Sequence, residues 1–134
     1  MDAVQIAAFL KRYWIGCKYW PRNTIVGWIQ WHINNRCAFS VMDNGKPVAV
    51  MLAKPLNDPV KHVNNHYEIN EQGNSIWISV MVSRNKQSLP MFCMMLIERF
   101  GVRKWFCAER EKYSGRIHQQ DFHKLTQKLI GSYL

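Results

Sequence analysis

The sequence predicts one α/β (α+β) domain in which a central, mostly antiparallel twisted sheet is flanked by helices. Helical patterns lie at both ends of the chain, patterns typical of strands occupy its middle, and a further helical pattern interrupts the strands. The length of 134 residues suits a single domain, 1–134. Because 48% of the residues are hydrophobic and 20% are charged, the chain is expected to bury a core.

The N-terminal segment is expected to form two helices. Asp2 can cap a first helix that runs to Trp14, because apolar residues follow it at helical spacing. Pro21 then interrupts the chain, and the segment Thr24–Asn34 carries a second helical pattern.

The middle of the chain is expected to form two hairpins. The first joins Arg36–Met42 to Pro47–Ala53 through an Asp-Asn-Gly sequence that is typical of a tight turn. The second joins His66–Asn70 to Ser75–Val82 through a polar turn. Because Ser75–Val82 is almost continuously apolar, it is expected to be a central strand.

The last third of the chain predicts a helix, a strand and a final helix. Ser88 is placed to cap the first of these helices, with Pro90 in its first turn, and Gly101 is expected to end it. A strand over Val102–Ala108 and a helix over Gln119–Ser132 follow, and the charged stretch between them is expected to be a surface loop.

The chain is strongly basic, with a net charge of +9. From Lys11 to Arg36 it has five basic residues and no acidic one, interleaved with tryptophans. Such a surface favours polyanions, either nucleic acid or an acidic protein partner, and aromatic side chains beside basic ones can stack bases. Trp20 is expected to be partly exposed. Three other tryptophans are expected in the core: Trp14, Trp28 and Trp77.

The four cysteines lack the short paired spacings of a zinc site and are expected to be free, buried thiols. The longest uncharged run near the N-terminus, residues 23–35, is too short and too polar to cross a bilayer. The first apolar stretch lacks the cleavage site of a secretory signal. The protein is therefore expected to be cytoplasmic and to have no membrane partner.

The order of these elements resembles the GNAT superfamily of acyl-CoA-dependent N-acyltransferases. In that superfamily two helices precede a run of antiparallel strands, and a central strand leads through a phosphate-binding loop into a helix. Here Ser75–Val82 is similar to the central strand, Ser83–Ser88 to the loop and Ser88–Phe100 to the helix. The resemblance covers most of the chain and implies an N-acetyltransferase that uses acetyl-CoA to acylate an amine.

The resemblance also implies where the site residues lie. A helix N-terminus offers unpaired N–H groups and partial positive charge to a pyrophosphate. The cofactor-binding residues would be Val80, Val82, Arg84, Lys86, Gln87 and Ser88. Glu68 would be the catalytic base and Tyr113 the acid. Without the resemblance, Glu68 reads as an exposed strand residue and Tyr113 as a residue of a surface loop.

Two features depart from the superfamily pattern. The superfamily loop carries glycines, whereas residues 84–90 contain none, and Pro90 removes a backbone donor. The two strands that usually follow the last helix are expected to be missing. Short GNAT-like proteins of tailed bacteriophages are similar in both respects. The alternative function is therefore a non-catalytic phage protein, in the host cytoplasm or the virion, that acts through protein or nucleic-acid contacts.

Overall fold

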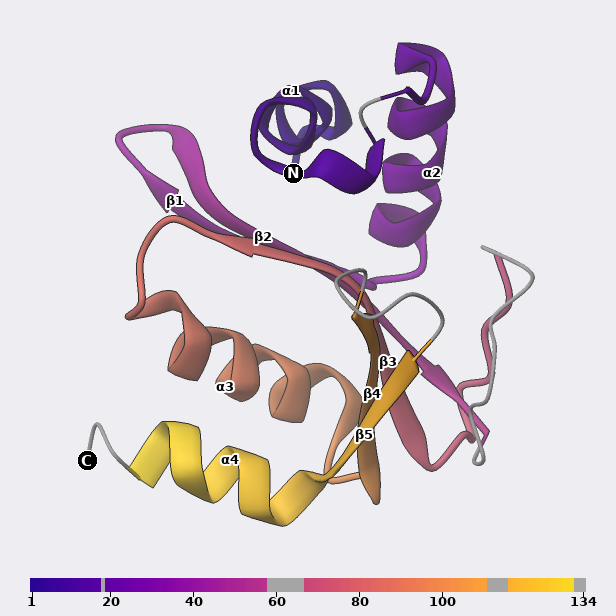
Figure 1. The fold of residues 1–134 in the computed structure, drawn as a ribbon, viewed down its shortest axis with the longest axis vertical. Coiled ribbons are helices and arrows are strands. Elements are labelled where there is room, and N and C mark those ends of the chain that lie inside the picture. Colours follow the sequence, from indigo (N-terminus) through magenta and orange to yellow (C-terminus); the bar gives the residue numbers. More distant parts are fainter. Residues whose placement is uncertain (18, 58–66, 111–115, 132–134) are drawn as a thin grey trace.

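The computed structural model describes residues 1–17, 19–57, 67–110 and 116–131, which form a five-stranded sheet with helices on both faces (Figure 1). Helices α1 (Ala3–Tyr13) and α2 (Arg22–Asn34), joined by a short 3-10 turn η1 (Ile15–Cys17), cover one face; α3 (Ser88–Phe100) and α4 (Phe122–Gly131) cover the other. The strands are β1 (Ala38–Asp43), β2 (Lys46–Leu56), β3 (Ser75–Ser83), β4 (Trp105–Arg110) and β5 (Arg116–Asp121).

The strands lie in the order β1-β2-β3-β4-β5. Three of the neighbouring pairs are antiparallel, and β3 with β4 is parallel. The prediction of a mostly antiparallel sheet flanked by helices is therefore confirmed, as is the central position of β3. None of the helices in the described ranges has the length and apolar character needed to cross a bilayer.

The core has two halves, one on each face of the sheet. Strand β2 contributes to both because its successive residues alternate: Val50 and Leu52 pack under α1 and α2, whereas Met51 and Ala53 pack against α3 and α4. Burial on both faces explains why β2 is apolar along most of its length. The helices bury Ile6, Leu10, Ile25 and Ile29 on the first face and Phe92, Leu96 and Phe122 on the second.

The predicted local signals shape the elements as expected. The Asp2 side chain accepts hydrogen bonds from the N–H groups of Val4 and Gln5, at 2.9 and 3.3 Å, and so caps α1. The turn between β1 and β2 has positive φ angles, 52° at Asn44 and 76° at Gly45, as a tight hairpin requires.

The four cysteines are free and buried, as predicted. Burial raises the pKa of the Cys37 and Cys93 thiols to about 11, so both thiols stay protonated at neutral pH. Trp28 and Trp77 are buried as expected, and Trp20 is partly exposed. Trp14 is half-buried against the α1–α2 half of the core rather than fully enclosed.

The predicted second hairpin is wrong. Residues 67–70 form no strand, and His66 lies outside the described residues. The first half of β3 already has a strand on each side: Ile76 is opposite Pro55 of β2 and opposite Phe106 of β4. A further strand therefore has no edge of β3 left to pair with over these residues.

Strand β5 was not predicted, and the last helix begins at Phe122 rather than at Gln119. Gln120 and Asp121 pair with Phe106 and Trp105 of β4. The Asp121 carboxylate then accepts a hydrogen bond from the N–H of Lys124 at 3.0 Å, which marks the start of α4. The Phe122 ring stacks on Phe106 at 4.3 Å between centroids and anchors the helix to the sheet.

Two arginines hold the turn that precedes β3. Arg99 donates to the Glu71 carboxylate at 2.7 and 3.3 Å and to the Arg36 carbonyl at 2.9 Å. The hydrogen bond from Arg99 lowers the pKa of Glu71. Arg103 donates to the carbonyls of Glu71 and Gly73. Arg99 at the end of α3 and Arg103 shortly after it therefore hold the turn before β3. Arg99 also holds the chain at Arg36, just before β1.

Gly73→Ala is expected to destabilise the protein by about 2 kcal/mol or more, because the added Cβ would overlap the backbone carbonyl group of Leu56. Gly27→Ala in α2 is the matched control, since its Cβ would meet open space, and it should stabilise by about 0.5–1 kcal/mol. Urea unfolding measures both. Equal stability of the two variants would contradict this packing of the turn.

Candidate functional site

The candidate site lies where β3 and β4 diverge. The parallel pairing covers only four positions, from Ser75 opposite Trp105 to Ile78 opposite Ala108. Strand β3 then continues to Ser83, and within the described residues no strand pairs with this second half on the β4 side. An open strand edge presents backbone N–H and C=O groups that an extended ligand can pair with.

Strand β3 also bulges at the point of divergence. Leu52 of β2 is opposite Val80 and Ala53 is opposite Ile78, so Ser79 has no partner in the register. As a result Ile78 packs on the α3 side of the sheet, whereas Val80 packs under α1 and α2. Bulges are frequent beside active sites because they redirect a strand. We therefore add Ser79 to the candidate site; sequence reasoning missed it because a bulge in an apolar strand leaves no pattern.

Helix α3 begins just beyond the end of β3. The helix has 13 residues, and its N-cap residue Gln87 makes no side-chain capping bond. The prediction that Ser88 caps the helix is wrong: Ser88 is the first helical residue, and its hydroxyl is buried without a hydrogen-bond partner among the residues that the structure describes. An unpaired buried hydroxyl beside helix N–H groups suits an anionic ligand that accepts hydrogen bonds.

Polar side chains shape the glycine-free loop between β3 and α3. The Ser83 hydroxyl donates to the Asn85 carbonyl at 2.5 Å and accepts from the Asn85 N–H at 3.1 Å. The Asn85 side-chain oxygen accepts from the N–H of Gln87 at 2.9 Å, which closes an Asx turn. These bonds turn the chain into α3 without the conformational freedom of glycine.

The two loop cations have different roles in this structure. Arg84 donates to the Tyr13 hydroxyl at 2.6 Å, and its guanidinium carbon lies 4.5 Å from the centre of the Tyr13 ring. Lys86 is exposed. Both line an open hollow of about 800 Å³ between the loop, the end of α1 and the β1–β2 turn, where Asp43 supplies a carboxylate. Tyr13 joins the site from a distant part of the sequence, which no local pattern indicated.

The remaining predicted residues are not gathered at this place. The side chains of Val80 and Val82 pack in the core under α1 and α2. Their backbone groups face β2, because the Arg84 N–H bonds to the Val48 carbonyl and every second residue of β3 repeats that pairing; the backbone groups of Met81 and Ser83 face the open edge instead. Glu68 is exposed in a segment without strand structure, so its predicted place in a strand is wrong. Tyr113 lies outside the described residues. Within the described part of the chain, no group of three His, Cys, Asp or Glu side chains could hold a metal ion.

Lys54 is a buried cation close to the bulge. It follows Ala53 in β2, is 1% exposed, and its amine lies 5.5 Å from the centre of the Trp31 ring. Burial lowers the pKa of Lys54 to about 8, although the charge of Glu68 acts in the opposite direction. A lysine with this pKa is partly neutral near physiological pH and can exchange a proton there.

Lys54→Met should abolish a rise in stability between about pH 8 and pH 10.5. In this window the unfolded chain keeps the proton on Lys54 and the folded chain has lost it, so stability increases with pH. The variant should also be about 2–3 kcal/mol more stable than the wild type at pH 7. Urea unfolding at several pH values tests this, with the exposed Lys46→Met as control. Parallel pH curves for Lys54→Met and the wild type would contradict the burial of this amine.

No protein-family model and no curated protein matches this chain. Among solved structures, its fold is similar to the GphF GNAT-like decarboxylase in complex with isobutyryl-CoA, with a TM-score of 0.60 and 14% sequence identity. The match covers 80% of this chain and 60% of that chain, so this chain spans less than two thirds of the decarboxylase. The mixed sheet and its flanking helices therefore have a GNAT-like fold, as the order of elements indicated.

Proposed function

We propose that the protein binds an acyl-CoA at the open edge of β3 and acts as an N-acetyltransferase on an amine. The observation that carries the proposal is the Ser79 bulge, which lies at the start of an open strand edge that leads directly to the N-terminus of α3. The similarity to a decarboxylase in complex with isobutyryl-CoA supports the class of ligand. Acetyl-CoA and an amine acceptor are the further steps of the proposal.

The residues of the site fit such a ligand. The backbone of Met81 and Ser83, rather than that of Val80 and Val82, faces the open edge and can pair with the amide groups of an extended pantetheine arm. The N-terminus of α3 and the unpaired Ser88 hydroxyl can donate hydrogen bonds to the phosphates, and Lys86 can add a positive charge. The bulge can direct a backbone N–H of Ser79 toward the acyl carbonyl and polarise it.

Bound acyl-CoA would supply an activated acyl carbon, whose C–S bond breaks as the C–N bond forms and the amine proton passes to the sulfur. This chain must then provide a group that holds that proton. Glu68 as base and Tyr113 as acid stay predictions. Glu68 lies close enough to Lys54 for its charge to raise the pKa of that amine. A Glu68→Gln variant that keeps full transferase activity would remove Glu68 from the proposal.

A non-catalytic GNAT-like protein is the second candidate. Two observations favour it: Arg84 is already bound to Tyr13, and Asp43 is the carboxylate among the residues that line the hollow. Asp43 lies at the β1–β2 turn rather than at the bulge. Such a protein would keep the fold while acting through contacts with a partner.

Millimolar acetyl-CoA is expected to raise the Tm. A ligand at a hundred times its Kd stabilises by about 2.7 kcal/mol, which is about 8 °C for a domain of this size. The double variant Arg84→Ala, Lys86→Ala should lose the shift, and the exposed Lys124→Ala in α4 should keep it. ADP serves as the control for generic phosphate binding. An equal shift in wild type and double variant would exclude the loop as the phosphate site.

Ser88→Ala separates the ligand role of the hydroxyl from a structural role. Without ligand, this variant should be as stable as the wild type or about 1 kcal/mol more stable, because it removes a buried, unpaired hydroxyl. With acetyl-CoA, its Tm shift should be smaller than that of the wild type. A destabilised variant with an unchanged ligand shift would contradict the role given to Ser88.

A further inference from the structure

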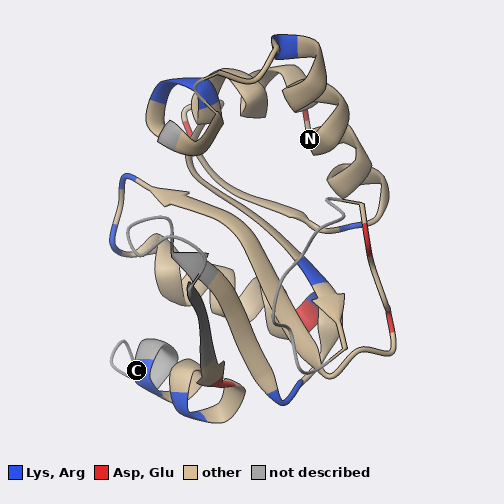
Figure 2. Ribbon diagram, turned by 45° about the vertical axis from the view of Figure 1, so that its right-hand side comes forward, with Lys and Arg blue, Asp and Glu red and all other residues tan. Residues whose placement is uncertain are grey.

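The layer formed by α1 and α2 carries an excess of positive charge. Between Ala3 and Met42 the sequence has five basic residues and no acidic one. Arg12, Arg22 and Arg36 are exposed. Figure 2 shows basic segments on this layer, together with an acidic segment beside the N-terminus, where α1 begins. Carboxylates border this layer at Asp2, Glu68 and Glu71, and the charge of Arg36 acts on Glu71. The remaining excess of positive charge, at Arg12 and Arg22, attracts polyanions.

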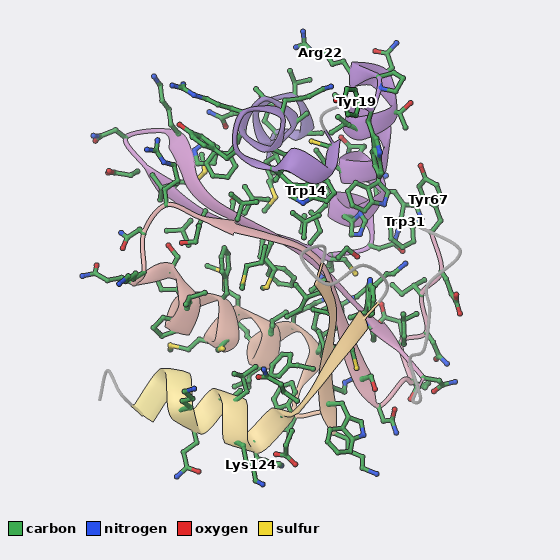
Figure 3. The ribbon with its side chains drawn as sticks, in the orientation of Figure 1. Trp14, Tyr19, Arg22, Trp31, Tyr67 and Lys124 are labelled. Carbon is green, nitrogen blue, oxygen red and sulfur yellow. The ribbon has the colours of Figure 1, made fainter. Side chains whose placement is uncertain are left out.

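Exposed tyrosines accompany this charge at both ends of α2. Tyr19, in the turn that leads into α2, is 88% exposed, and Tyr67 is 49% exposed. The Tyr67 ring meets Trp31 edge-on at 5.5 Å between centroids. Figure 3 shows Tyr19 and Arg22 at one end of α2 and Trp31 with Tyr67 near the other. We call these four residues the α2 face.

The turn that carries Tyr19 is held by contacts of Trp20 with α1 and α2 residues. The Trp20 ring packs against Trp28 at 5.2 Å and against Trp14 at 6.0 Å between centroids. Lys11 donates to the Trp20 carbonyl at 2.6 Å. These three tryptophans therefore support the turn that carries Tyr19. Because the turn is held in place, a ligand that stacks on the Tyr19 ring needs to order the side chain but not the backbone.

We propose that the α2 face binds single-stranded nucleic acid. Arg22 would contact phosphates, and Tyr19 and Tyr67 would stack on bases, which expose their faces only where the strand is unpaired. An acidic protein would satisfy the charge but would not need exposed aromatic rings at both ends of α2. None of the four residues belongs to β3, to the loop that follows it or to α3, so this binding is independent of acyl-CoA.

Fluorescence anisotropy with a labelled oligo(dT) tests the proposal, with a hairpin duplex of equal length as the competing substrate. Tyr19→Ala should weaken binding about tenfold through lost stacking, and Tyr19→Phe should restore it. Arg22→Ala should weaken binding and reduce the slope of log K against log salt by about 0.7, the value for one phosphate contact on a single strand. Lys124→Ala, an exposed lysine on α4 at the opposite side of the molecule, is the matched control and should bind as the wild type does (Figure 3).

Three results would overturn the proposal: no binding at low salt, equal preference for the duplex, or the same loss in Lys124→Ala as in Arg22→Ala. The Tm of each variant without ligand verifies that it is folded, which the exposure of Tyr19 leads us to expect. Acetyl-CoA should not displace the oligonucleotide, and Tyr19→Ala should keep its acetyl-CoA shift. Displacement would place the oligonucleotide at the acyl-CoA site and would also overturn the proposal.

Discussion

The register of β3 is the constraint on which the candidate site depends. Up to Ile78 the strand is held between β2 and β4; beyond Ser79 it keeps only β2 as a partner. The bulge rotates the strand at this point, so that Val80 is buried under α1 and α2 while the opposite edge opens. The bulge at Ser79 therefore sets both the core packing of β3 and the position of its open edge. The loop and α3 come directly after this part of the strand.

The loop shows how a phosphate-type site can be built without glycine. Ser83 and Asn85 make the turn with their side chains, and Arg84 is held by Tyr13 of α1. The same turn leaves the Ser88 hydroxyl buried and unpaired, at a cost of about 1–3 kcal/mol to the free protein. A ligand that accepts this hydrogen bond recovers the cost, which couples the stability of the loop to its occupancy.

The sequence indicated those features that depend on neighbouring residues. The cap at Asp2, the turn at Asn44 and Gly45 and the end of α3 at Gly101 all follow from local conformational preferences. The errors concern pairing between distant segments. The first half of β3 pairs with β4 across the whole of α3, which excludes the expected hairpin, and β5 is a polar edge strand without apolar alternation. The bulge at Ser79 and the contact of Tyr13 with Arg84 likewise depend on long-range packing.

An NMR titration of the ¹⁵N-labelled protein with acetyl-CoA tests the central claim most directly, because it reports on individual backbone amides. We predict shift changes concentrated at Ser79 and along the open half of β3, and at Ser88 and Leu89 at the start of α3. The resonance of an amide away from this edge, such as that of Phe39 in β1, should not shift. Shifts confined to other parts of the protein, or none at saturating ligand, would contradict an acyl-CoA site at the open edge of β3.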